Sequence, residues 1–200
     1  MKKILSGICL LSIALLAFKP ASELAIGAAL PKADITLKDI SGKEVTLKSV
    51  MKPKGLLVMF SCNTCPYVIK NQARTKEICT YAEQNGLGVI ILNSNEAQRT
   101  TDDSFADMQA YAKAQGYNWS YAVDANSELA DAFGASRTPE CYLFDKDAKL
   151  EYHGAIDDSP NDAAAVKNQH LKNAIDEMNA GKEVSVKTSR SVGCAIKRKG

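Results

Sequence analysis

Two short stretches of the chain, residues 56–60 and 89–92, are almost entirely apolar. Runs of this kind are typical of strands that are covered on both faces of a sheet. The segment between them, residues 66–84, has the length of a helix, and Asn85-Gly86 supplies a stop for it. Since strand, helix and strand follow one another, the pattern predicts a βαβ unit with two parallel strands at its centre.

Weaker patterns predict the elements around this unit. Polar and apolar residues alternate on both sides of Ser41-Gly42-Lys43, as in a hairpin of half-exposed strands. In chain order, we expect a hairpin at 35–40 and 44–47, helices at 104–115 and 127–133, a strand at 141–144 with a hairpin partner at 150–156, and a final helix at about 162–179. This order predicts an α/β fold in which helices flank a mixed central β-sheet, with an N-terminal β-hairpin extension.

Residues 1–21 have the pattern of a secretory signal peptide. Met1-Lys2-Lys3 provides a basic start, residues 4–18 an apolar stretch, and Lys19-Pro20-Ala21 a polar end. The apolar stretch is shorter than the about 20 residues that a membrane-spanning helix needs, so we expect export rather than a stable membrane anchor. Cleavage is expected between residues 21 and 29, which leaves a domain at residues 30–180 and an irregular, basic tail at 181–200.

Charge and cysteine content narrow the range of functions. The full chain has a net charge of +2, and removal of the signal peptide takes away three lysines, so the exported chain is close to neutral. A nucleic-acid partner is not expected, because phosphate binding needs a concentrated basic surface. Of the six cysteines, Cys9 leaves with the signal peptide, and the other five meet an oxidising environment in the periplasm or outside the cell.

The clearest chemical signal is Cys62-Asn63-Thr64-Cys65-Pro66, which follows the first apolar strand. A strand that leads into a helix places a thiol at the helix N-terminus, where free N–H groups and the helix dipole favour the thiolate. We expect Cys62 to be the more exposed thiol at this helix start and Cys65 to be its partner. A C-x-x-C pair in a βαβ unit indicates thiol–disulfide exchange.

Two other uses of a C-x-x-C pair fit the sequence less well. A zinc site would need two further ligands at matching spacing, but the other cysteines and both histidines lie singly along the chain. A purely structural disulfide would close a very short loop and would stabilise the fold little. We therefore expect no metal and no cofactor.

Thr138-Pro139, shortly before the predicted strand at 141–144, completes a pattern that resembles the thioredoxin-like redoxins over residues 33–180. Within that superfamily, the chain is similar to a peroxiredoxin-like branch related to alkyl hydroperoxide reductase and thiol-specific antioxidant proteins. The segments that carry this likeness are Cys62-Asn63-Thr64-Cys65-Pro66-Tyr67-Val68, Arg137-Thr138-Pro139-Glu140, Tyr152-His153-Gly154-Ala155-Ile156-Asp157-Asp158 and Val192-Gly193-Cys194-Ala195-Ile196-Lys197. Thr64 stands where the branch carries a histidine, so no role of that histidine is carried over.

The resemblance implies a thioredoxin-like fold in which a cis Thr138–Pro139 peptide bond faces the dithiol. It implies that Cys62 attacks a substrate disulfide and that Cys65 then attacks the mixed disulfide and releases reduced substrate. Pro139 would shape the groove beside Cys62, and the Thr138 backbone would pair with an extended substrate. The expected partners are disulfide-containing or dithiol protein substrates, together with a redox donor or acceptor.

Two auxiliary residues have more than one interpretation. Glu140 is either a proton carrier for Cys65 or, as we favour, a surface carboxylate. Cys194, where the branch also has a cysteine, is either a bystander in a flexible tail or forms a transient or resting disulfide with the active pair. Cys79 and Cys141 are expected to be small buried hydrophobic residues.

Two other functions remain as alternatives. A thiol peroxidase would use Cys65-Pro66, but Val58 and Cys62 stand where the peroxiredoxin motif has proline and threonine. A periplasmic copper chaperone would hold the metal through both thiols and a histidine, for which His153 is the candidate.

Overall fold

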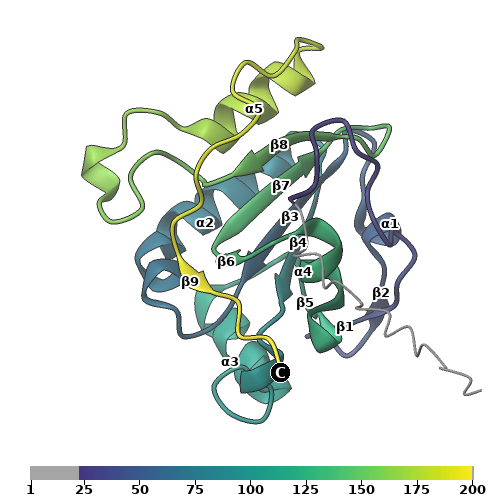
Figure 1. Ribbon diagram of the computed structural model, residues 1–200, viewed down its shortest axis with the longest axis vertical. Coiled ribbons are helices and arrows are strands. Elements are labelled where there is room, and N and C mark those ends of the chain that lie inside the picture. The colour runs from purple at the N-terminus through teal and green to yellow at the C-terminus, as the bar shows by residue number, and fades with distance from the viewer. Residues whose placement is uncertain (1–22, 200) are drawn as a thin grey trace, which may run out of the picture.

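A seven-stranded mixed sheet forms the centre of the structure, a computed structural model that describes residues 23–199 (Figure 1). Its strands run in the order β2-β1-β5-β4-β3-β7-β8. They are β1 (Leu37–Asp39), β2 (Glu44–Val45), β3 (Leu56–Ser61), β4 (Gly88–Asn93), β5 (Ser120–Val123), β7 (Glu140–Phe144) and β8 (Leu150–Gly154). A second, two-stranded sheet joins β6 (Arg137–Thr138) to β9 (Cys194–Ala195).

The predicted βαβ unit lies at the centre of this sheet. All six residues of β3 and all six of β4 are buried, and the two strands pair in parallel from Leu56–Gly88 to Ser61–Asn93. β7 pairs with β3 in the antiparallel direction, and the β1–β2 hairpin extends the opposite end of the sheet through β5. The expectation of a mixed sheet with an N-terminal hairpin is thus confirmed.

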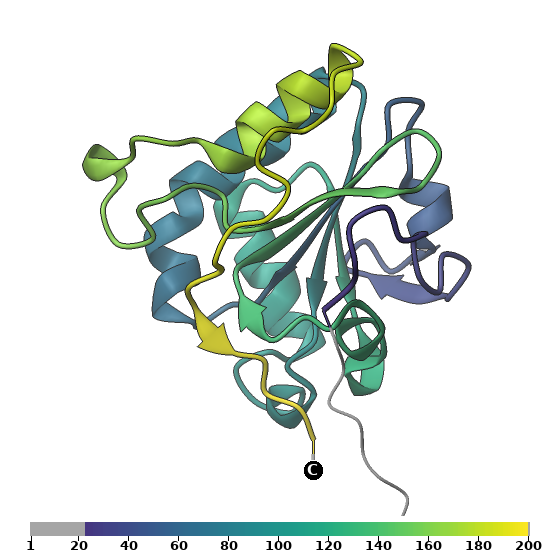
Figure 2. The ribbon, with the colours of Figure 1, turned by 45° about the horizontal axis from the view of Figure 1, so that its top comes forward.

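Helices cover both faces of the sheet. They are α1 (Leu47–Val50), α2 (Pro66–Gln84), α3 (Phe105–Gln115), α4 (Glu128–Phe133) and α5 (His170–Asn179), with short 3-10 turns at Glu96–Gln98, Ala125–Ser127 and Ala163–Ala165. Side chains of α2, α3 and α5 pack with Leu57 and Met59 of β3, and those of α1 and α4 pack with Val58 and Phe60. α5 lies alongside α2 (Figures 1 and 2). Because neighbouring residues of a strand point to opposite faces, one strand contributes to both cores.

The first differences from the predicted elements lie after β2 and before the last helix. The chain after β2 forms α1 instead of continuing as a strand, because the side chains of Thr46 and Ser49 each accept a hydrogen bond from the other residue's backbone N–H. The last helix begins at His170 rather than near residue 162. The Asp158 carboxylate accepts hydrogen bonds from the backbone of residues 167 and 168, which keeps that segment out of a helix.

The tail (residues 181–199 of the described chain) is not irregular throughout but crosses the edge of the sheet (Figure 1, yellow). It first runs beside β8, where His153 N donates to Lys187 O and Ser189 N donates to His153 O, each at 3.0 Å. β9 then pairs antiparallel with β6. Two tail side chains, Val184 and Ile196, are buried in the two cores. The prediction of a flexible, irregular tail is wrong here, because pairing between segments far apart in the chain leaves no periodic pattern in either segment.

The predicted signal peptide lies outside the described residues. Immediately after it, Leu24 N donates to Phe133 O at 3.1 Å and Leu30 N donates to Ala148 O at 2.9 Å, so the chain is already part of the fold at these positions. Within residues 23–199, no helix combines the length and the apolar character needed to cross a bilayer.

Phe133 of α4 should make a large contribution to stability. Its ring meets Phe60, Tyr142 and Phe144 edge-on, with centroid separations of 5.4, 5.1 and 5.8 Å. Phe133→Ala leaves a cavity that close-packed neighbours refill poorly, so we expect the free energy of unfolding to fall by about 3–5 kcal/mol in urea titrations. The control Ile69→Ala, at a side chain that is 56% exposed, should change it by no more than about 0.5 kcal/mol. Equal effects of the two changes would contradict this assignment of the core.

Candidate functional site: a thiol cluster at the end of β3

The dithiol lies at the edge of the sheet where the parallel strands end. Cys62 is the first residue after β3, and α2 begins at Pro66, so Cys65 is the N-cap residue of that helix. Proline fits this first position because the N–H that it lacks would have no partner inside the helix. The free N–H groups of the first helical turn therefore lie next to the two sulfurs.

Thr138 and Pro139 face this pair from the loop before β7. The peptide bond between them is cis, as the resemblance implied. The Thr138 hydroxyl lies 3.5 Å from the Cys62 sulfur, and the Cys65 sulfur lies 3.4 Å from the Thr138 carbonyl oxygen. The structure thus brings together the four residues that the sequence analysis assigned to the site.

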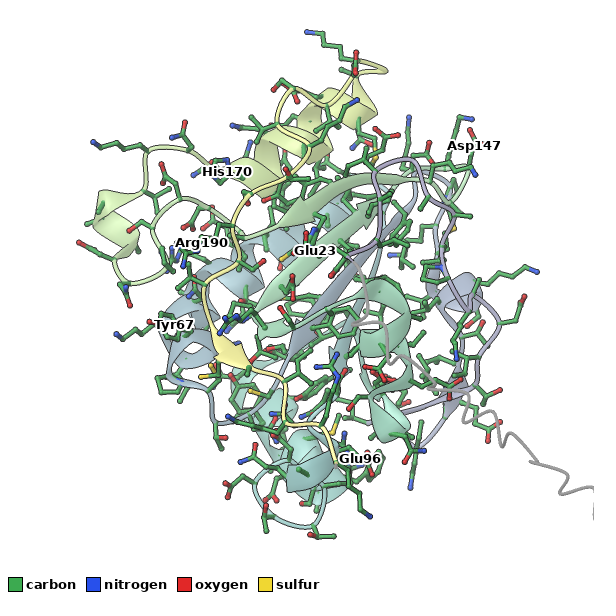
Figure 3. The ribbon with its side chains drawn as sticks, in the orientation of Figure 1. Glu23, Tyr67, Glu96, Asp147, His170 and Arg190 are labelled. Carbon is green, nitrogen blue, oxygen red and sulfur yellow. The ribbon has the colours of Figure 1, made fainter. Side chains whose placement is uncertain are left out.

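The expected difference in exposure between the two thiols is wrong. Cys62 is 3% exposed and Cys65 is 5% exposed, and it is Cys65 that stands at the helix start. Cys62 continues directly from a fully buried strand. In addition, Tyr67 and Cys194 pack against the two cysteines and Val68; Tyr67 lies next to β9 in Figure 3. The tail therefore covers the dithiol that the sequence predicts to be open.

The surroundings of the Cys65 sulfur favour its thiolate. The largest effect on its pKa is a hydrogen bond from the Cys62 thiol. The thiol and N–H of Cys194 and the N–H of Val68 act in the same direction. Together they lower the pKa of Cys65 to about 4, although burial acts to raise it. The same bond to Cys65, burial and the nearby Asp103 carboxylate raise the pKa of Cys62. The two shifts have opposite directions, so the surroundings favour a single thiolate in the pair, at Cys65 rather than at Cys62.

A buried polar network fixes the loop between the two cysteines, and nothing in the sequence analysis pointed to it. One oxygen of Asp103 accepts hydrogen bonds from Asn63 N at 2.9 Å and from Asn93 Nδ2 at 2.7 Å. The Tyr121 hydroxyl donates to Asn63 Oδ1 at 2.8 Å. Asp103 is fully buried, and these bonds compensate its loss of hydration. The signal that could have found the network is the polar run at residues 93–95, directly after an apolar strand.

Glu140 is buried, which corrects its interpretation as a surface carboxylate. Its Oε2 accepts hydrogen bonds from the N–H groups of Ser136 and Arg137 at 2.8 and 3.0 Å, and its Oε1 lies 2.8 Å from His153 Nε2. The carboxylate thereby ties the turn before the cis peptide bond to β8. Because its two oxygens serve this turn and His153, the geometry gives no support to a proton path from Glu140 to Cys65.

His153 does not join the thiols. Its ring stacks on Tyr142 with a centroid separation of 4.4 Å and bonds to Glu140. In the part of the chain that the structure describes, no group of three or more His, Cys, Asp or Glu side chains is placed to hold a metal ion. The copper-chaperone alternative thus lacks the third ligand on which it depended.

Cys194 is brought into the site by the tail. It lies on β9 opposite Thr138 in the β6–β9 register. Burial and the hydrogen bond to Cys65 raise the pKa of Cys194, so this thiol is protonated and acts as the donor in that bond. Cys79 and Cys141 are fully buried in the core beneath α2, as the sequence predicts.

The two cysteines should titrate in different pH ranges. In Cys62→Ser, the serine hydroxyl still donates to the Cys65 sulfur, so we expect the thiolate to form well below the ordinary pKa of 9.0. In Cys65→Ser, the buried Cys62 should titrate near or above 9.0. The measurement is the pH dependence of alkylation, followed by mass spectrometry of each peptide, with Cys79→Ser as the control. A low pKa in Cys65→Ser alone would reverse the assignment of the charge.

Glu140→Gln tests the structural role of that carboxylate. Glutamine keeps the volume but weakens the bonds from the two N–H groups, so we expect a loss of about 1–3 kcal/mol in the free energy of unfolding. The pH–rate profile of disulfide exchange should keep its shape. Glu44→Gln, at an exposed position, is the matched control. A displaced acid limb of the profile would restore the role of Glu140 as a proton carrier.

Comparison with known proteins shows the family to which the chain belongs. The family model described as "AhpC/TSA family" matches residues 26–153, a range that includes the dithiol and Thr138-Pro139. Over 134 residues, the chain is 21% identical to the thiol-disulfide oxidoreductase ResA of Geobacillus thermodenitrificans (strain NG80-2), with 67% of this chain and 71% of ResA covered.

Two solved structures resemble nearly the whole chain. A hypothetical protein from Sinorhizobium meliloti 1021 is 33% identical with a TM-score of 0.81, over 90% of this chain and 97% of that one. An uncharacterized conserved protein from Geobacillus kaustophilus is also 33% identical with a TM-score of 0.81, over 88% of this chain and 93% of that one. With its mixed sheet, its flanking helices and these relatives, the chain has a thioredoxin-like fold and belongs to the AhpC/TSA family.

Proposed function

We propose that this protein is an exported thiol–disulfide oxidoreductase whose Cys62–Cys65 pair exchanges disulfides with protein or small thiol substrates. The observation that carries the proposal is the position of the Cys65 sulfur at the N-terminus of α2, where N–H and S–H donors stabilise its thiolate. A thiolate with a second thiol beside it is the arrangement that the reaction requires. The likeness to a thiol-disulfide oxidoreductase supports the same class of reaction.

The reaction proceeds in two exchanges. The Cys65 thiolate attacks one sulfur of a substrate disulfide, and the other substrate sulfur leaves and takes up a proton. Cys62 then loses its proton and attacks Cys65 in the mixed disulfide, which releases reduced substrate and leaves a Cys62–Cys65 disulfide. A redox donor returns two electrons and two protons. This order is the reverse of the one that the resemblance implied; we propose it because Cys65 stands at the start of α2 and its surroundings lower its pKa.

The surroundings of the pair suit a peptide substrate. Pro139 and Thr138 form one wall beside the sulfurs, and β6, which pairs with β9 in this structure, would offer its backbone groups to an extended segment that replaces β9. Disulfide-containing or dithiol proteins are therefore the proposed substrates, with a separate redox partner that restores the starting state. The direction of electron flow follows from the potential of that partner.

Export is part of the proposal and rests on the pattern of residues 1–21. A periplasmic or secreted location would expose the mature domain at 30–180 and the tail to an oxidising environment, in which a disulfide-exchange protein finds its substrates.

A thiol peroxidase is the second candidate, since Cys65 at the start of α2 also suits attack on a peroxide. Peroxide cleavage needs donors arranged around that sulfur. The Arg137 guanidinium is instead turned to the Gly193 carbonyl oxygen, 3.4 Å away, and Val58 and Cys62 replace the proline and threonine of the motif. Disulfide exchange therefore ranks first.

Exchange kinetics test both candidates. We expect Cys65→Ser to reduce a small disulfide at least about a hundredfold more slowly than the native protein, because the thiolate is lost. Cys62→Ser combined with Cys194→Ser should trap a mixed disulfide on Cys65, since both resolving thiols are absent. Cys79→Ser, which changes a distant core cysteine, is the control.

Three outcomes would count against this scheme. Equal rates in native protein and Cys65→Ser would remove the proposed function. A mixed disulfide that accumulates only in Cys65→Ser would reverse the order of attack. Consumption of hydrogen peroxide at a rate comparable to disulfide exchange would favour the peroxidase.

A further inference from the structure

The tail occupies the strand edge at which a substrate of the dithiol would bind. Thr138 pairs with Cys194 in antiparallel register, and Ile196 N donates to Ser136 O at 3.0 Å. Extended peptides bind exposed strand edges through the same main-chain hydrogen bonds. The docking position that the proposed function requires is therefore filled by the chain's own β9.

Cys194 is the side chain that this strand presents to the dithiol. It packs in one cluster with Cys62 and Cys65, and its thiol and N–H help to lower the pKa of Cys65. The N–H of Tyr67, in the first turn of α2, donates in turn to the Cys194 sulfur. Cys65 thus has two neighbouring thiols, one from the loop after β3 and one from the tail.

Contacts on both sides of β9 hold this strand in place. Before it, the Ser189 hydroxyl bonds to the Tyr152 hydroxyl at 2.6 Å and accepts from Ala155 N at 2.9 Å. After it, Lys197 N donates to Asn95 Oδ1 at 2.8 Å, and Arg198 forms an ion pair with Asp131. These anchors restrict the tail to one path across the site.

Gly193 permits the close approach of the tail to Thr138. A Cβ atom built at this position would lie 2.1 Å from the Thr138 carbonyl oxygen, which no side chain tolerates without displacement of the backbone. Since the obstructing atom belongs to the backbone beside the dithiol, a larger residue at 193 would lift β9 and leave all three thiols unchanged.

We propose that the tail is an intramolecular substrate of the dithiol: β9 closes the docking edge, and Cys194 exchanges disulfide bonds with Cys65. This inference rests on the proposed function. In the oxidised protein, Cys194 gives its proton to solvent and attacks Cys65; the Cys194–Cys65 bond forms, the Cys62–Cys65 bond breaks, and Cys62 leaves as a thiolate that takes up a proton. One disulfide replaces another, so no oxidant or reductant is consumed.

The tethered thiol gives the site a preference among external substrates. A thiol held beside its target reacts at an effective concentration of millimolar order or higher, so it competes well with free thiols. A small disulfide needs only to reach the sulfurs, whereas a protein substrate that pairs with β6 must first displace β9. The tail therefore slows exchange with proteins more than exchange with small disulfides.

Oxidation of Cys62→Ser tests the exchange step. With oxidised glutathione, we expect a single intramolecular Cys65–Cys194 disulfide, identified by mass spectrometry after acid quenching. Cys65→Ser is the matched control and should form far less Cys62–Cys194 disulfide, because Cys194 donates to Cys65 and not to Cys62. A stable glutathione adduct on Cys65, without the Cys65–Cys194 bond, would overturn the exchange.

Gly193→Ala tests the docking role with every thiol retained. We expect reduction of a protein disulfide such as insulin to accelerate by about tenfold and the yield of Cys65–Cys194 disulfide to fall by a similar factor, because the effective concentration of Cys194 drops. The control is Val186→Ala in the same tail, at a side chain that is 45% exposed. Equal acceleration in both variants, or none in Gly193→Ala, would contradict the docking role.

Cys194→Ser separates the two parts of the proposal and serves where Gly193→Ala folds poorly. It keeps β9 and removes the sulfur, so protein substrates should remain slow while the Cys65–Cys194 disulfide disappears. Failure of the proposed function would look different: the native protein would exchange neither small nor protein disulfides. Failure of this inference alone would leave native exchange intact and all the tail variants without effect.

Discussion

Burial of β3 on both faces is the constraint from which the site follows. Its first five residues are shared between the two cores, so the chain has no position for reactive polar groups until it leaves the sheet after Ser61. The first free positions are Cys62 to Cys65, at the edge where β3 and β4 end together. Packing of α2 on one face of the sheet then directs the first turn of that helix back over the same edge. Core packing thus places the sulfurs beside unpaired helical N–H groups.

Two buried carboxylates hold the two halves of the site. Asp103 binds the Asn63 N–H and so fixes the loop that carries the dithiol. Glu140 binds the N–H groups of the turn before Thr138-Pro139. A buried carboxylate without these partners would cost free energy. The same hydrogen bonds that stabilise each carboxylate therefore also hold the loop and the turn in place. The sulfurs and the facing Thr138 backbone are therefore positioned by polar contacts that lie outside the reacting groups.

The charge of the thiol cluster and the position of the tail are linked. Cys194 supplies two of the donors that favour the Cys65 thiolate, so a docked β9 favours charge on Cys65. A substrate that displaced β9 would remove those two donors and change the balance between Cys62 and Cys65. The order of attack that the resemblance implies, with Cys62 first, does not include this contribution of the tail to the pKa of Cys65. In this fold, β9 both covers the site and helps to lower the pKa of Cys65.

The sequence by itself determined the central βαβ unit and the place of the dithiol, because doubly buried strands and helix starts leave local signatures within a few residues. The place of Thr138-Pro139 opposite the dithiol was implied by the resemblance to the thioredoxin-like redoxins. The length of the segment between the two apolar strands also placed α2 at its observed bounds, and α3 was predicted to within one residue. Only the tertiary structure decided that Glu140 is buried, that Asp103 reaches Asn63, and that Cys194 lies against Cys65. These three facts depend on contacts between segments far apart in the chain. A hydrogen bond or a two-residue strand pairing between such distant segments requires no regular spacing of residues in either segment, so no local pattern predicts it.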